Sequence, residues 1–157
     1  MNQTLPPNAR DDIEIRNIIE EARVIIPGLQ ALFGFQTIAV FNDRFDQLPE
    51  YVKDCHLLGL SMIIIAIALV MTPAAYYRAV NCKMTHEATS MCGGLIRGAL
   101  VPLSIGLSLD MFTVVYVTTS TLWISIGAAI ATFLVLAGLW FVLPVRARRE
   151  ARREAGR

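Results

Sequence analysis

The sequence predicts an all-α integral membrane protein with four transmembrane helices, preceded by an amphipathic cytoplasmic helix. Hydrophobic residues make up 55% of the 157 residues, whereas soluble domains are about 45–50% apolar. The charged residues, 17% of the chain, gather near the two ends and in two loops. Between them lie four apolar stretches, each close to the roughly 20 residues that a helix needs to cross a bilayer.

Residues 1–23 form the predicted cytoplasmic N-terminal segment. Ile15, Ile18, Ile19 and Ala22 fall on one helical face, with charged residues on the others. This pattern is typical of an amphipathic helix on the inner membrane surface, and the same apolar face could instead dock a partner. The segment lacks the basic start and apolar core of a secretory signal, so we expect the first span to stay in the protein.

The predicted transmembrane domain covers residues 24–143. Its spans are about 24–41, 57–75, 95–117 and 122–143. In lipid, backbone polar groups must bond within the segment, so these runs should be helical. Pro27 and Gly28 predict a kink in the first span, and the polar run 118–121 predicts a tight turn before the last.

Positive charges predict the direction of the spans, because cytoplasmic loops retain Lys and Arg. Twelve lie on one side: Arg10, Arg16, Arg23, Arg78, Lys83, Arg97, Arg146, Arg148, Arg149, Arg152, Arg153 and Arg157. Only Arg44 and Lys53 lie on the other. We therefore expect both termini in the cytoplasm. The basic tail, residues 144–157, should attract anionic lipid at about 1 kcal/mol per cation.

Asp110 is the first candidate functional residue, because no other charged residue lies between Arg97 and Pro144. An intramembrane acid can bind a cation or proton in transit. Gln30, in the first span, could line the same path or hydrogen-bond to a neighbouring helix. Alternatively, Asp110 lies near the outer headgroups and ends the buried part of its helix.

Small residues recur every four positions along the third span and predict a helix-packing groove. They are Gly94, Gly98, Pro102 and Gly106, and Asp110 continues the series. We expect these residues to share one helix face, where small side chains let neighbouring backbones approach closely. Asp110 would then point toward the bundle.

A charge cluster is expected at the inner membrane boundary. Its members are Glu20, Glu21, Arg23, Arg78 and Arg97. They could form an ion-pair network that ties three helix ends together, or a gate or anion site in which Arg acts as a bidentate clamp.

No cofactor or metal is expected. His56 and His86 are assigned to opposite sides of the membrane, which excludes a haem held by both. Cys82, His86 and Cys92 lack the close ligand pair and the fourth ligand of a structural zinc site. The chain has no nucleotide-binding or hydrolase motif and no basic aromatic patch for nucleic acid, so we expect neither enzymatic activity nor nucleic-acid binding.

Three segments together resemble a known family: EARVIIPGLQALFGFQ (Glu21–Gln36), TPAAYYR (Thr72–Arg78) and LWFVLP (Leu139–Pro144). The chain is similar over nearly its whole length to an uncharacterised bacterial family of small four-helix membrane proteins, catalogued as domain of unknown function 6328. The resemblance implies a multi-pass protein of the bacterial plasma (inner) membrane. Tyr77 stands where the family usually has His, so a role for that His does not carry over.

Two functional hypotheses follow. The first is a non-enzymatic accessory or self-associating membrane subunit, favoured by the short chain and the scarcity of buried charge. Its partners would be lipid and either further copies or a larger membrane complex. The alternative is a small oligomeric channel or transporter that conducts a cation or proton past Asp110 and Gln30, with Glu21, Arg78 and Arg97 at its inner mouth.

Overall fold

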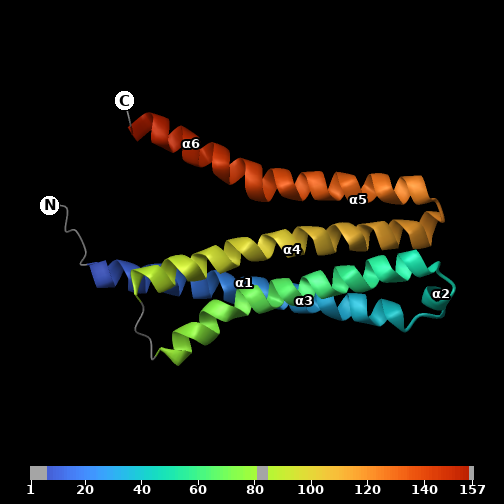
Figure 1. The fold of residues 1–157 in the computed structure, drawn as a ribbon, viewed down its shortest axis with the longest axis horizontal. Helices are drawn as coiled ribbons and strands as arrows, with labels where there is room; N and C mark the ends of the chain where they lie inside the picture. The colour runs from blue at the N-terminus through green and yellow to red at the C-terminus, as the bar shows by residue number, and fades with distance from the viewer. Residues whose placement is uncertain (1–6, 81–84, 156–157) are drawn as a thin grey trace.

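The computed structural model describes residues 7–80 and 85–155, and everything described is helix, turn or loop (Figure 1). The elements in chain order are α1 (Pro7–Val40), α2 (Asp43–Asp46), α3 (Glu50–Ala79), α4 (His86–Thr119), α5 (Leu122–Ala137), the π-helix η1 (Gly138–Val142) and α6 (Leu143–Ala155). The long helices run alongside one another. The start of α1 and the end of α6 lie at one end of the molecule, here called the tail end, and α2 lies at the other, the loop end.

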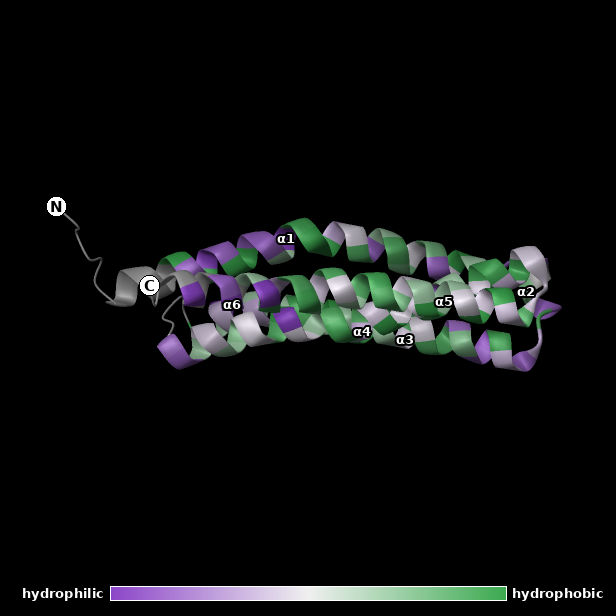
Figure 2. Ribbon diagram, turned by 90° about the horizontal axis from the view of Figure 1, so that it is seen from above, coloured by the Kyte–Doolittle hydropathy of each residue, from purple (hydrophilic) through white to green (hydrophobic). Residues whose placement is uncertain are grey.

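Four helical segments are long and apolar enough to cross a membrane, as predicted. They are Ile13–Val40, Glu50–Ala79, His86–Thr119 and Leu122–Ala147. Hydrophobic residues dominate the middle of these helices and hydrophilic ones gather toward their ends (Figure 2). Three of the helices begin well before the predicted spans, because hydropathy marks only the apolar part of a helix that continues beyond it.

The bundle core is a seam between α1, α3 and α4. Buried positions on α3 alternate in spacing between four and three residues: Val52, His56, Gly59, Ile63, Ala66, Val70 and Pro73. The same alternation on α4 joins Thr89, Cys92, Ile96, Ala99, Leu103 and Gly106. A mean spacing of 3.5 residues keeps one face of each helix toward its neighbours, as in a coiled coil. Asp110 occupies the next position of this seam on α4.

The N-terminal segment is part of α1, and the structure shows no separate amphipathic helix in the described residues. α1 is one helix with Pro27 inside it. Its apolar face does not lie free for a membrane surface or a partner, because Ile15, Ile18 and Ala22 are buried in the bundle core. A face that packs on protein and one that lies on lipid have the same periodicity, which is why the sequence pattern led to the other interpretation.

The ends of α4 have local causes in the sequence. At its start the side chain of Thr85 accepts a hydrogen bond from the backbone N–H of Ala88, at 3.3 Å, as an N-cap residue does. At its end Ser120 has a positive φ of 49°, and its N–H bonds to the Tyr116 carbonyl. The polar run predicted as a turn therefore reverses the chain between Thr119 and Leu122.

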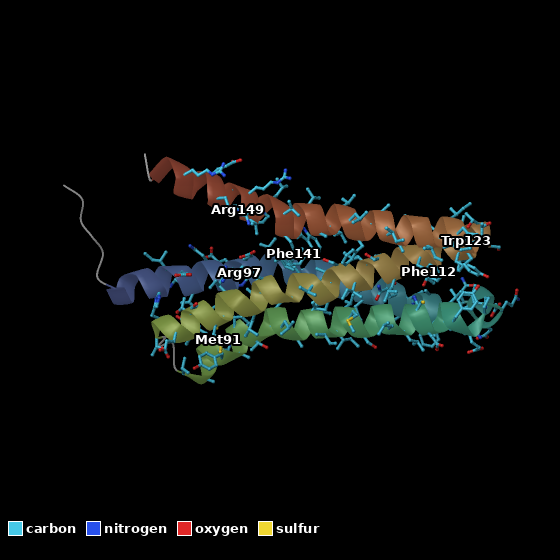
Figure 3. The ribbon with its side chains drawn as sticks, turned by 45° about the horizontal axis from the view of Figure 1, so that its top comes forward. Met91, Arg97, Phe112, Trp123, Phe141 and Arg149 are labelled. Carbon is cyan, nitrogen blue, oxygen red and sulfur yellow. The ribbon has the colours of Figure 1, made fainter. Side chains whose placement is uncertain are left out.

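The last span is peripheral. α5 packs chiefly against α4. The structure describes every residue of α5, and Ser125 is the only one that is buried. Trp123 lies at the loop end and Arg149 on α6 toward the tail end (Figure 3). Near the tail end of this span, Trp140 packs against the buried cluster.

The predicted groove on the third span is divided by the structure. Gly106 is buried in the seam, but Gly94 and Gly98 are exposed, and a β-carbon on either would meet nothing within 4 Å. Pro102 is half-buried. A spacing of four residues advances about 40° per step around a helix of 3.6 residues per turn. Gly94 and Asp110 are four such steps apart, so they cannot share one face.

Candidate functional site

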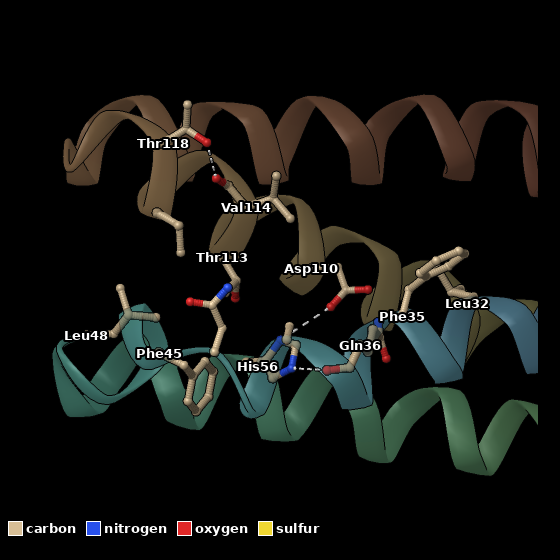
Figure 4. A pocket seen from close by; sticks show the side chains of 13 residues that line it. Leu32, Phe35, Gln36, Phe45, Leu48, His56, Asp110, Thr113, Val114 and Thr118 are labelled. Carbon is tan, nitrogen blue, oxygen red and sulfur yellow. Dashed lines mark hydrogen bonds and ion pairs between the residues drawn. The ribbon is translucent and has the colours of Figure 1, made fainter.

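A pocket of about 540 Å³ lies toward the loop end, lined by residues of α1, α2, α3 and α4 (Figure 4). Most of its wall is apolar, including Leu32, Phe35 and Phe45. Polar side chains that are almost fully buried line it as well: Gln36 is 5% exposed and His56 is 3% exposed. Pockets of this size that combine an apolar wall with a few convergent polar groups are typical binding sites.

The orientation of His56 is fixed by α1. Its Nε2 lies 3.0 Å from the backbone carbonyl oxygen of Gln36, and the Phe45 ring and the imidazole pack in a T-shaped arrangement at a centroid distance of 5.4 Å. A carbonyl oxygen only accepts hydrogen bonds, so Nε2 carries a hydrogen and donates it. The other ring nitrogen, Nδ1, is left to face α4.

Asp110 lies opposite that nitrogen. Its Oδ1 is 3.7 Å from Nδ1 of His56, and its side chain is 15% exposed. The two groups are too far apart for a direct hydrogen bond, and Nδ1 has no hydrogen-bond partner among the described residues. Asp110 therefore faces the bundle, as one of the two sequence interpretations expected.

The charge of this pair depends on how many protons its two facing atoms hold. With Nε2 as the donor, a neutral His56 presents the lone pair of Nδ1 to the oxygens of Asp110. If Asp110 were ionised as well, an uncompensated carboxylate would lie in a largely buried place, at a cost of several kcal/mol. One proton, either on Nδ1 or on the carboxyl group, makes the pair neutral overall. The pair in this neutral form is called the one-proton site below.

Two glycines bring the pair together. A β-carbon on Gly106 would lie 3.1 Å from the carbonyl oxygen of Gly59, and one on Gly59 would lie 3.3 Å from the carbonyl oxygen of Gly106 and 3.7 Å from Oδ1 of Asp110. The backbones of α3 and α4 meet here with no side chain between them. Because His56 and Asp110 are within four residues of this contact on their helices, the glycines set their separation.

The Gln36 amide is the third polar group. Neither Nε2 nor Oε1 of its side chain has a hydrogen-bond partner among the described residues. A buried amide without a partner costs about 1–3 kcal/mol, and in a native protein such a group calls for an explanation. A ligand that occupies the pocket would supply one.

The site lies inside the loop end of the bundle. Asp110 is nine residues, about 14 Å of helix, before the end of α4 at Thr119. α4 has 34 residues and is therefore about 51 Å long, so about 10 Å projects from each face of a hydrocarbon core of about 30 Å when the helix is centred on it. This arrangement puts Asp110 just inside the hydrocarbon.

The other candidates from the sequence lie elsewhere. Gln30 is exposed on α1 and does not line the pocket. No ion pair joins the five members of the inner charge cluster within the described residues. Arg23 and Arg78 line a separate hollow between α1 and α3, while Nε of Arg97 donates to the carbonyl oxygen of Gly93, 3.1 Å away.

His56 and Gln36 were missed as site residues. His56 was assigned to the outer loop because it precedes the apolar part of its span. The alternating spacing of four and three residues, followed back from Gly59, places His56 in the seam. On α1 the same spacing, followed forward from Leu29, reaches position 36 and not position 30.

Within the described residues, no three His, Cys, Asp or Glu side chains group closely enough to hold a metal ion. Cys82, considered with His86 and Cys92, lies outside the described residues.

Comparison with known proteins gives one result. A family of unknown function (DUF6328) matches residues 6–144. No curated protein and no solved structure matches the chain.

Proposed function

Since this chain belongs to the DUF6328 family, a family of unknown function, we propose its function from the site: a small, non-enzymatic membrane transport protein that takes up and releases a proton at His56 and Asp110. The observation that carries the proposal is the distance of 3.7 Å between Nδ1 and Oδ1, with Nε2 bonded to the Gln36 carbonyl. Ionisable groups within membrane spans are rare and usually functional.

The pathway needs more than one copy of the chain. Three helices form the core, and α5 packs chiefly on α4, so a single chain encloses no continuous route. The mouth of the pocket includes Phe35 and Val114, whose side chains are largely exposed in the single chain. A second copy packed beside this opening, without closing it, would line the rest of the route.

Proton flux into proteoliposomes tests the proposal. The full chain, reconstituted with a pH-sensitive dye inside the vesicles, should carry protons down an imposed gradient. Asp110→Asn should abolish the flux, because the amide cannot exchange the shared proton. Asp54→Asn, which removes an exposed carboxylate on α3, is the matched control and should retain it. Equal flux through both variants would contradict the proposal, as would no flux from folded wild-type protein.

We propose further that the tail end is cytoplasmic, that the protein lies in a bacterial plasma membrane and that the basic tail binds anionic lipid. The distribution of Lys and Arg supports this orientation. The tail continues the last span as α6, on which Arg146, Arg149 and Arg153 are exposed. Binding of a water-soluble anionic lipid to the detergent-solubilised wild type, and to a variant in which these three residues are replaced by Gln, tests the lipid contact. Equal affinity of the wild type and the variant for this lipid would contradict it.

A second candidate function is an accessory or self-associating subunit. Its support is the exposed pair Gly94 and Gly98 on α4, where a β-carbon would meet nothing within 4 Å. Glycines four residues apart are a common contact between membrane helices. Co-purification from the native membrane distinguishes the accessory subunit from the proton transport protein. A stable partner that binds the wild type and is lost in Gly98→Leu would favour the accessory subunit. If Gly98→Leu kept the partner, the contact would not be formed by Gly94 and Gly98.

A further inference from the structure

We infer that the pocket binds an amphiphilic organic cation, a protonated primary or secondary amine with an apolar body, in exchange for the proton of His56 and Asp110. The inference rests on the proposed proton site and names the class of molecule that would use it. Three observations support it. The buried end of the pocket, its floor, has unpaired hydrogen-bond acceptors, and the opening, its mouth, is apolar. The third is the position of the pocket in the bilayer.

The floor of the pocket offers hydrogen-bond acceptors that lack a donor. Oε1 of Gln36 and Nδ1 of His56 have no hydrogen-bond partner among the described residues, and the carboxylate of Asp110 only accepts when it is ionised. An ammonium group supplies up to three N–H donors and one positive charge. Its charge would compensate the carboxylate, and its donors would satisfy the buried acceptors.

The mouth of the pocket is apolar and open at the side of the bundle. Phe35 is 74% exposed and Val114 is 61% exposed, and both line the pocket together with Leu32. This opening lies between α1 and α4, where lipid surrounds a single chain. A bound molecule would therefore have its cationic head at the floor and its apolar body between these side chains.

Size and depth agree with that orientation. A volume of about 540 Å³ suits a small organic molecule and is too large and too apolar for a bare metal ion, which needs about six oxygen ligands. When α4 is centred on the membrane, Asp110 lies just inside the hydrocarbon boundary. An amphiphilic amine partitions to that level, with its charge among the headgroups and its apolar body among the acyl chains.

Proton and amine exclude each other at this site. Among the described residues that line the pocket, the titratable ones are His56 from α3 and Asp110 from α4; α1 contributes the amide of Gln36, and α2 contributes Phe45. The pair is neutral when it holds one proton. An ammonium group added to that state would leave a buried positive charge without a partner, so its binding expels the proton. By linkage, protons weaken amine binding and amine weakens proton binding.

Calorimetric titration of the purified full chain with 4-phenylbutylamine tests the inference. Wild-type protein should bind the amine and release one proton, counted by comparing buffers of different ionisation enthalpy. The dissociation constant of the amine should fall about tenfold for each unit by which the pH is raised, as long as the free site is protonated. Asp110→Asn should lose both the binding and the proton release, and Asp54→Asn should retain both. Gln36→Leu should bind more weakly but keep the same pH dependence.

Two further probes test the head group without changing the protein. The matched quaternary amine, 4-phenylbutyltrimethylammonium, has no N–H donor and should bind at least tenfold more weakly. The neutral 4-phenylbutanol should release no proton. Equal affinity for the alcohol and the primary amine would overturn the inference and mark the pocket as a lipid crevice. Proton release caused by sodium chloride alone would also overturn it.

The result separates this inference from the proposed function. Proton flux in proteoliposomes without amine binding would contradict the ligand class alone. Amine binding with release of one proton, but without proton flux, would contradict transport and leave the binding site standing.

Discussion

Gly59 and Gly106 hold α3 against α4: a β-carbon on Gly106 would lie 3.1 Å from the carbonyl oxygen of Gly59 and 3.0 Å from a side-chain carbon of Ile63. The contact is one of backbone on backbone. His56 and Asp110 lie just beyond it toward the loop end, so the packing of two residues without side chains determines the geometry of two residues that carry the chemistry.

Gly106→Ala should therefore destabilise the bundle by about 1–3 kcal/mol, because the added methyl group forces the two helices apart. Gly98→Ala on the same helix is the matched control. A β-carbon there meets nothing within 4 Å, and Ala favours a helix interior over Gly by about 0.5–1 kcal/mol, so this change should not destabilise the protein. Unfolding of the detergent-solubilised protein by denaturant gives both values. A similar effect at both positions would show that the glycine contact has no special role.

His56 and Asp110 should be energetically coupled. Replacing His56 by Ala leaves the carboxyl group of Asp110 without its proton partner, so the double variant with Asp110→Asn should be less destabilised than the sum of the single changes. We expect a coupling of about 0.5–3 kcal/mol in the free energy of unfolding. The matched control is the double-mutant cycle of His56→Ala with Asp54→Asn, in which the carboxylate is exposed. Additive behaviour of His56 and Asp110 would mean that the two groups do not interact.

Gln36→Leu should stabilise the empty protein by about 1–3 kcal/mol, because it removes a buried amide that has no hydrogen-bond partner within the described residues. Gln30→Leu removes the same group from an exposed position on the same helix and should change the free energy of unfolding by less than about 0.5 kcal/mol. Thermal unfolding of the three proteins side by side measures this. A clear loss of stability in Gln36→Leu would indicate that the amide has a structural partner.

The start of α1 should behave as core. Ile15 is 0% exposed and Ile13 is 49% exposed, so Ile15→Ala should cost about 2–5 kcal/mol and Ile13→Ala much less. If the segment instead lay on the membrane surface, the two substitutions would have similar, small effects on the free energy of unfolding.

The sequence predicted the spans well because the signal for crossing a bilayer is local. A run of apolar residues such as Leu57–Ala75 is sufficient to identify a span, and the polar run at Thr118–Thr121 is sufficient to identify the turn. The ends of the helices were harder to predict. α3 and α4 continue as helix into polar sequence, where hydropathy no longer distinguishes a helix from a loop.

The site was predicted in part. Asp110 was found because it is the only charge in a long apolar run. Its partner was not found, since His56 lies outside the apolar part of α3 and its burial depends on contacts with two other helices. Gln30 was the predicted amide and Gln36 was not, because the sequence gives no reference face on α1. Gly94 and Gly98 do not share the buried face of Gly106, because positions four residues apart drift around a helix of 3.6 residues per turn.

Nitrogen-15 NMR of imidazole-labelled protein in lipid bilayers measures the proton shared by His56 and Asp110 most directly, with a His86→Gln variant to assign the two histidines. We expect Nε2 of His56 to carry a hydrogen throughout a pH titration. Nδ1 should report the gain or loss of one proton, and Asp110→Asn should shift or remove that transition. A hydrogen on Nδ1 with none on Nε2, or a titration of His56 that Asp110→Asn leaves unchanged, would contradict the one-proton site.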